Sequence, residues 1–153
     1  MMMKVLILSG SKSDADYVKR VESVLEDFDV KFDSIVSSAH RQPEKTQEIA
    51  RKAEADGYGV IIALAGFAAA LPGFAASHSN LPVIGVPLPG SDLNGVDAML
   101  AILQMPGGVP TVSTGIGSAG AKNAALQAVR ILALSDDKLK KKLQDYKTKL
   151  AEG

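Results

Sequence analysis

The chain has 153 residues, a length typical of one domain. Its 17 basic and 17 acidic side chains cancel, which argues against nucleic acid or a membrane surface as a partner. Cysteine is absent, which excludes disulfides and thiolate chemistry, and we expect a cytoplasmic protein.

The first predicted strand is the continuous apolar run at residues 5–8, which is too short to span a membrane. A helix is expected directly behind it. Ser13 and Asp16 have the spacing of a capping box, with Asp in the place of Glu. Apolar side chains then recur at helical spacing over residues 17–28.

The middle of the chain repeats this strand and helix pattern twice. Residues 30–36 predict a second strand, and Pro43 suits the first turn of a helix that we expect Gly57 to end. Residues 60–65 are apolar throughout and predict a third strand. A short helix is expected over residues 71–77.

The second half of the chain is mostly helical. Residues 81–86 predict a fourth strand, residues 96–104 a helix, and residues 110–114 a weak fifth strand. We expect a helix of mainly Ala, Leu, Val and Ile over residues 119–134 and a charged helix over residues 136–150.

Apolar strands that alternate with helices imply a parallel sheet covered on both faces. We therefore predict an α/β fold, a three-layer sandwich around a parallel five-stranded sheet of flavodoxin-like order, with an extra C-terminal helix. Residues 1–153 are expected to form a single domain, in which residues 1–134 are the α/β core and residues 135–153 the C-terminal helix.

Two of the predicted helices are apolar on most sides. Residues 96–104 and 119–134 would expose much apolar surface in a small monomer, so we infer subunit contacts. The C-terminal helix has a heptad-like seam that could pack either on a neighbouring subunit or on its own domain. The seam consists of Leu139, Leu143, Tyr146 and Leu150.

Ligands of parallel α/β sheets bind beyond the carboxyl ends of the strands, which points to the loops at residues 10–14, 37–41, 66–73 and 87–95. The first of these loops opens a helix, whose amide groups and dipole favour a phosphate. Ser11 and Ser13 can add hydroxyl donors, and Asp14 can accept from sugar hydroxyls. These residue types are equally typical of a helix cap.

The second loop carries stronger candidates. Arg41 can hold an anion in a bidentate fork. His40 is a candidate for proton transfer, because histidine is the residue type that exchanges protons near neutral pH. Ser38 could orient a carboxylate. The alternative is structural: His40 bonds to a carbonyl at the strand end, and Arg41 forms a surface ion pair.

The third loop consists mainly of small residues, which let backbone amides approach a ligand closely and leave an apolar pocket. Close packing of a helix on the sheet would use the same small residues. His78, near a helix C-terminus, is interpreted as a surface residue. Two histidines 38 positions apart, with no cysteine, predict no metal site.

Six motifs together resemble those of the PurE family of purine biosynthesis, in order and over nearly the whole chain. They are Gly-Ser-Lys-Ser-Asp (10–14), Ser-Ala-His-Arg-x-Pro (38–43), Leu-Pro-Gly (71–73), Gly-Val-Asp-Ala (95–98), Gln-Met-Pro-x-Gly-Val-Pro (104–110) and Ala-Lys-Asn-Ala-Ala (121–125). Class I members are 5-(carboxyamino)imidazole ribonucleotide mutases, which move a carboxylate from the exocyclic amine to a ring carbon. The resemblance therefore implies an isomerase that acts on a small ribonucleotide.

The resemblance also implies site residues and an assembly. His40 would be the general acid and base, Ser11 and Arg41 would bind phosphate, and Asp14 would bind ribose. Residues 65–70 would hold freed carbon dioxide. No metal or organic cofactor is implied, and the expected assembly is a homo-octamer with active sites between subunits and the C-terminal helix on a neighbour. The other candidate substrate-binding residues are Ser13, Ser38, Ala39, Gly66, Ala69, Ala70 and Leu71.

The third loop departs from the family pattern, in which class I enzymes usually have Gly-Gly-Ala-Ala-His-Leu-Pro-Gly. This chain has Phe67 in place of the second Gly and Ala70 in place of the His. Two alternatives follow: a class II carboxylase that uses free carbon dioxide, and a catalytically weak nucleotide-binding paralogue. The retained motifs at residues 38–41 and 71–73 favour class I.

Overall fold

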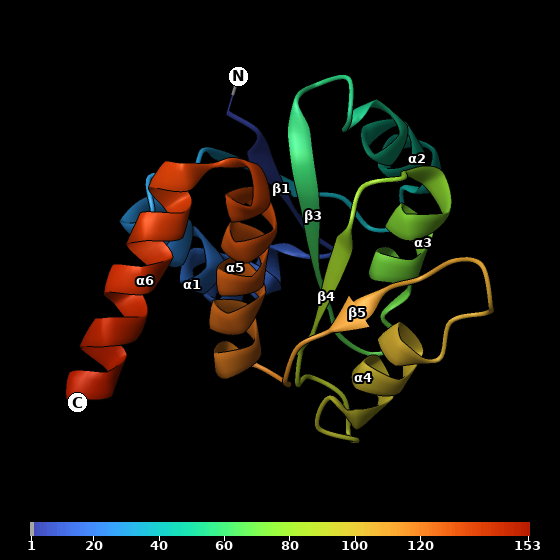
Figure 1. Cartoon of the computed structure of the whole chain (residues 1–153). Coiled ribbons are helices and arrows are strands. Elements are labelled where there is room, and N and C mark those ends of the chain that lie inside the picture. Colours follow the sequence, from blue (N-terminus) through green and yellow to red (C-terminus); the bar gives the residue numbers. More distant parts are fainter. Residues whose placement is uncertain (1) are drawn as a thin grey trace.

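A computed structural model describes residues 2–153, which contain one five-stranded parallel sheet in the order β2-β1-β3-β4-β5 (Figure 1). The predicted α/β fold with flavodoxin-like strand order is confirmed. The elements are β1 (Lys4–Ser9), α1 (Ala15–Asp27), β2 (Phe32–Val36), α2 (Pro43–Lys52), β3 (Tyr58–Ala65), α3 (Ala70–His78), β4 (Val83–Pro87), α4 (Val96–Leu103), β5 (Val112–Ser113), α5 (Ser118–Leu132) and α6 (Asp137–Glu152), with short 3-10 turns at Lys12–Asp14 and Ala133–Ser135.

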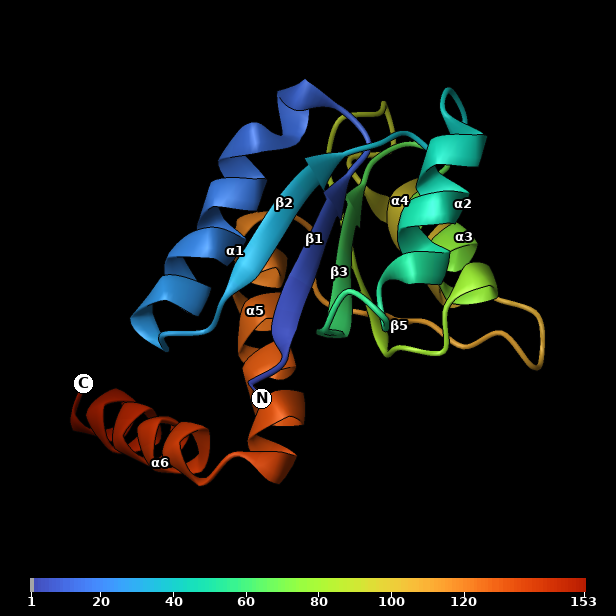
Figure 2. The same cartoon turned by 90° about the horizontal axis from the view of Figure 1, so that it is seen from above.

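Helices cover both faces of the sheet, with α1 and α5 on one side and α2, α3 and α4 on the other (Figures 1 and 2). Neighbouring residues of β1 point to opposite faces. Val5 and Ile7 pack with α1 and α5, whereas Leu6 and Leu8 pack with α2 and α3. Both faces are buried, which is why the central strands are apolar without alternation.

The apolar character of α5 is explained within the chain. Its buried side chains join the core formed by the sheet and α1, and the end of α6 nearest to it packs there as well. Helix α4 differs, because Leu100 and Leu103 remain 47% and 49% exposed. Of the two helices from which we inferred subunit contacts, only α4 keeps a large apolar surface.

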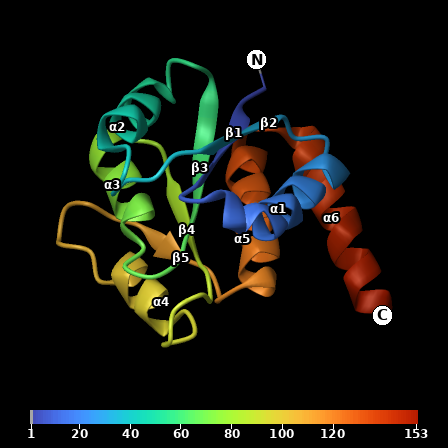
Figure 3. The same cartoon turned by 180° about the vertical axis from the view of Figure 1, so that it is seen from behind.

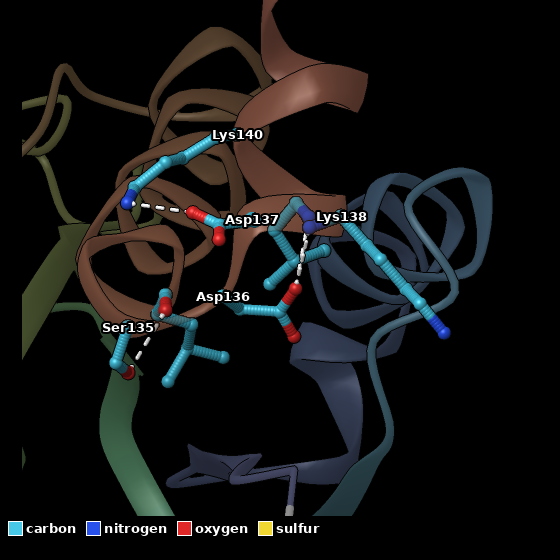
Figure 4. A network of polar contacts seen from close by, with 7 residues as sticks. Ser135, Asp136, Asp137, Lys138 and Lys140 are labelled. Carbon is cyan, nitrogen blue, oxygen red and sulfur yellow. Dashed lines mark hydrogen bonds and ion pairs between the residues drawn. The ribbon is translucent and has the colours of Figure 1, made fainter.

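Helix α6 lies beside α1 and α5 (Figures 1 and 3). Asp136 caps its N-terminus by accepting hydrogen bonds from the amides of Lys138 and Leu139 at 2.9 and 3.1 Å (Figure 4). Leu139 is buried in the chain's own core, and the Tyr146 ring packs edge-on against Phe28 at 5.6 Å. Most of the predicted seam therefore packs on its own domain.

Contact of α6 with a neighbouring subunit stays a prediction, and it would have to use the outer face and the C-terminal end of the helix. Leu150, the last residue of the seam, is 60% exposed. Among residues 2–153, every helix is too short or too polar to span a bilayer.

Most element boundaries lie within one or two residues of the predicted ones, and two features at helix ends differ for a physical reason. Helix α2 begins at Pro43 but ends at Lys52, and Gly57, with φ +88°, instead ends the turn that follows the helix. The predicted capping box at Ser13 is wrong: Ser11, in extended conformation, caps the 3-10 turn before α1 by accepting from the amide of Ser13 at 3.2 Å. This intervening turn moves the capping position two residues toward β1.

Candidate active site

A cavity of about 670 Å³ opens at the carboxyl ends of β1, β2, β3 and β4. The connections after β1 and β3 leave the sheet in opposite directions there, which is the usual place for a ligand in this topology. Every candidate site residue lines this one cavity. They are His40, Ser11, Ser13, Asp14, Ser38, Ala39, Arg41, Gly66, Ala69, Ala70 and Leu71.

The loop after β1 is held together by its two serine hydroxyls. Ser13 donates from its hydroxyl to the Ser11 hydroxyl at 2.9 Å, and the Asp14 amide donates to the Ser11 carbonyl at 3.1 Å. Ser11 therefore serves as a cap, and it also lines the cavity. The loop can cap the helix and bind a phosphate at the same time, because its hydroxyl and amide groups can also donate hydrogen bonds to a ligand oxygen.

Asp14 lies half-buried in the cavity wall. Burial raises the pKa of its carboxyl, and a backbone interaction with Ser11 and the charge of Arg41 lower it in part. A carboxyl with a raised pKa favours the folded state while it is protonated, and this contribution is lost as the pH rises through that pKa. Ionised Asp14 therefore contributes less to folding stability than protonated Asp14 does.

The loop after β2 carries His40 and Arg41 toward the loop after β1. The guanidinium Nη2 of Arg41 donates to the carbonyl of Gly10 at 3.0 Å, which links the two loops. The Arg41 amide donates to the hydroxyl of buried Ser38 at 3.2 Å. Within residues 2–153, His40 makes no hydrogen bond and Arg41 no ion pair, so the structural alternatives for these two residues are not seen.

A buried pair of hydroxyls, which the sequence analysis did not identify, anchors this loop. Ser37 and Thr46 are fully buried, and their hydroxyl oxygens lie 2.7 Å apart. The Thr46 hydroxyl also lies 2.9 Å from the Gln42 carbonyl and 3.2 Å from the Ser38 carbonyl. Because Thr46 sits on α2 and the loop lies just before it, this pair fixes the backbone that presents His40 and Arg41.

We expect Thr46→Val to lower the free energy of unfolding by about 1–3 kcal/mol, because it leaves the buried Ser37 hydroxyl without its partner and removes a second donor from two carbonyls. Thr46→Ser keeps the hydroxyl and is the matched control. Urea unfolding followed by far-ultraviolet circular dichroism measures both variants. Equal stability of Thr46→Val and Thr46→Ser would show that the hydroxyl does not anchor the loop.

The loop after β3 combines packing with an open wall. Ala69 and Leu71 are buried, yet both also line the cavity. The loop therefore packs a helix on the sheet and also forms part of the pocket wall, as the two interpretations of its small residues expected. The Ala69 amide donates to the Gly66 carbonyl at 3.0 Å, so this amide is used within the loop. Ala70 is the first residue of α3 and lines the cavity with a methyl group where the family pattern has an imidazole.

Several lining residues were not selected from the sequence. Leu88, Pro89 and Gly90 belong to the fourth loop, in which no residue type points to a particular role. Tyr17 begins the apolar face predicted for its helix, and it packs against the core as well as lining the cavity. Only the three-dimensional structure shows that one side chain serves both surfaces.

Phe67 also lines the cavity, and its backbone is unusual. Its φ of +52° lies in the left-handed region. A side chain with a Cβ atom costs roughly 1–2 kcal/mol there, and glycine avoids this cost. This conformation explains why the family pattern has a glycine at the position.

His78 lies outside the cavity, at the end of α3. Its Nδ1 is 2.9 Å from the carbonyl of Phe74, and its ring packs on the Phe74 ring at 4.6 Å. Over residues 2–153, no three His, Asp or Glu side chains gather in a way that could hold a metal ion. His40 is thus the imidazole of the cavity.

Comparisons with known proteins identify relatives over almost the whole chain. Residues 4–153 match the family model described as AIR carboxylase. N5-carboxyaminoimidazole ribonucleotide mutase of Pyrococcus abyssi is 50% identical over 146 residues, covering 95% of this chain and 83% of the relative. The mutase of the same name from Saccharolobus solfataricus is 48% identical over 145 residues, covering 95% of this chain and 90% of the relative.

Two solved structures have a similar fold. The crystal structure of Treponema denticola PurE superimposes with a TM-score of 0.88 at 30% identity and covers 97% of this chain and 91% of its own. That of Treponema denticola PurE2-S38D gives a TM-score of 0.90 at 29% identity, with 99% and 93% coverage. Fold and sequence therefore point to one and the same family.

Proposed function

This chain belongs to the AIR carboxylase family, and from that premise we propose that it acts as an N5-carboxyaminoimidazole ribonucleotide mutase in purine biosynthesis. The reaction is an isomerisation to 4-carboxy-5-aminoimidazole ribonucleotide. The observation that carries the proposal beyond family membership is the single cavity in which His40 and Arg41 meet the loops after β1 and β3. An acid–base group, an anion-binding group and an apolar niche are the three parts that this chemistry needs.

The nucleotide is bound by the first two loops. Arg41 and the Ser11 hydroxyl take the phosphate, because a guanidinium fork and a hydroxyl at the start of a helix both complement an anion. Asp14 accepts hydrogen bonds from the ribose hydroxyls. The link from Arg41 to the Gly10 carbonyl supports this assignment, since it brings the guanidinium to the loop that holds Ser11.

Proton transfer is the task of His40. The bond between the exocyclic nitrogen and the carboxylate breaks, its electron pair stays on nitrogen, and His40 supplies the proton that nitrogen needs. The ring carbon then forms a bond to the same carbon dioxide and loses its hydrogen to His40. One imidazole thus donates and accepts one proton, and the reaction is balanced without a second base.

Carbon dioxide waits between the two steps in the niche at residues 65–70, which are small except for Phe67. Ala65, Gly66 and Ala69 line it with little more than methyl groups and backbone. Carbon dioxide is uncharged, so it is held by shape and proximity rather than by an ion pair. The niche lies on the neighbouring loop of the same cavity as His40, which supports this assignment.

We further propose the homo-octamer that the family resemblance implies and the cytoplasmic location expected from the sequence. The exposed apolar side chains Leu93, Val96, Leu100, Leu103 and Val112 on and around α4 and β5 support subunit contacts, because such surfaces are usually covered by a partner.

The test of the proposed reaction uses two substrates. We expect the purified chain to convert N5-carboxyaminoimidazole ribonucleotide, made in place, to the carboxylated product, followed by its ultraviolet absorbance. Aminoimidazole ribonucleotide with bicarbonate should react far more slowly. A preference for the second substrate would instead identify a class II carboxylase, and binding without turnover of either would identify a weak paralogue.

A further inference from the structure

Phe67 places a large apolar ring at the rim of the cavity. The side chain is 63% exposed, although it lines the cavity, and its φ of +52° is strained for any residue with a Cβ atom. An exposed ring gains little from burial. Neither the backbone nor the packing of the chain favours phenylalanine at this position, and residues held in this way gather at ligand sites.

The surroundings of the ring leave it room to cover a ligand. Its Cε2 lies 3.7 Å from the point that a Cβ atom on Gly90 would occupy, so the ring reaches across to the loop after β4. Leu71 and Leu88 also line the cavity, but both are buried in the core and are fixed by it. Phe67 belongs to neither core cluster, so its ring can turn toward a ligand without disturbing the packing of the core.

We propose that the Phe67 ring closes over the bound nucleotide and retains carbon dioxide between the two halves of the reaction. This inference rests on the proposed mutase function. Once the nitrogen–carbon bond has broken and His40 has protonated the nitrogen, carbon dioxide has no charge by which Arg41 or Ser11 could hold it. The phenyl ring over the niche excludes water and retains carbon dioxide until the imidazole ring carbon of the nucleotide captures it.

Loss of the ring should therefore separate the two halves of the reaction. In Phe67→Gly, carbon dioxide escapes after the first half, and aminoimidazole ribonucleotide leaves without being carboxylated. Glycine relieves the strain at φ +52°, so we expect this variant to fold at least as stably as the parent chain. Phe67→Leu keeps an apolar group over the niche and is the matched control.

The experiment supplies unlabelled N5-carboxyaminoimidazole ribonucleotide together with ¹³C-bicarbonate and carbonic anhydrase. We measure the ratio of aminoimidazole ribonucleotide to carboxylated product, after subtraction of the enzyme-free loss of the carbamate, and the ¹³C content of the product. In Phe67→Gly we expect this ratio to rise about tenfold, which is a barrier change of about 1.4 kcal/mol, and label to enter the product. Phe67→Leu should stay within about twofold of the parent ratio.

Each other outcome has a defined meaning. A parent-like ratio and unlabelled product in Phe67→Gly overturn the role of Phe67 while leaving the proposed function intact. The role is also overturned when Phe67→Gly changes the mass of the assembly in solution, because the ring then packs on another copy. Absence of carboxylated product with the parent chain refutes the proposed function itself.

Discussion

His40→Ala is expected to lower kcat by roughly 10²–10⁴-fold, the usual contribution of a positioned acid–base group. The variant loses both the proton that the exocyclic nitrogen needs and the base that removes the ring hydrogen. Because the phosphate and ribose are held by other residues, the dissociation constant of the nucleotide should change by less than about threefold, an effect below 1 kcal/mol. Steady-state kinetics and titration calorimetry with the product measure the two effects separately.

The chain supplies its own control for this experiment. His78 is the other histidine, and it lies outside the cavity with its Nδ1 bonded at the end of α3. His78→Ala should therefore keep kcat and KM close to those of the parent chain. A His40→Ala variant with parent kcat would remove the proton-transfer assignment, whatever the behaviour of His78→Ala.

Arg41→Met should have the largest effect on binding, with a rise in KM of roughly 10–100-fold, the loss expected for a charge-assisted pair with a phosphate. Turnover at saturating substrate should fall much less, because His40 and the small-residue niche remain. Arg41→Lys keeps the charge but not the fork, so we expect an intermediate KM. Initial rates over a wide range of substrate concentration give KM and kcat for each variant.

Arg20→Met is the matched control, since Arg20 is exposed on α1 and does not line the cavity. It changes the net charge of the chain by the same amount as Arg41→Met. Equal KM values for the two methionine variants would mean that Arg41 acts only through general charge, and that another group binds the phosphate.

Much of the fold could be predicted from the sequence because the relevant signals are local. The unbroken apolar run of β3 requires burial on both faces, and burial on both faces requires helices on both sides of a parallel sheet. Pro43 marked the start of α2 for a similarly local reason, because proline fixes φ and lacks an amide donor. The end of α2 was not predictable from Gly57 alone, since a glycine suits both a helix end and a following turn.

The candidate site could be predicted in part for a topological reason. Loops at the carboxyl ends of parallel strands must meet at one edge of the sheet, so Ser11, His40 and Gly66 could be assigned to one place from their positions alone. Tyr17 and the hydroxyl pair of Ser37 and Thr46 were missed. Their roles depend on which atoms face one another across elements, and no spacing within a single element encodes that.

The sequence by itself determined the α/β class with its parallel sheet, the loops that form the cavity and the residue types that meet in it. Hydrophobic periodicity and the positions where strands end are local properties of the chain, so a sequence can show them. Only the tertiary structure decided that α6 packs on its own core, that Thr46 anchors the loop of His40, and that Phe67 stands exposed at a left-handed φ. Those features depend on contacts between segments far apart in the chain, and on a backbone conformation that a phenylalanine does not indicate in advance.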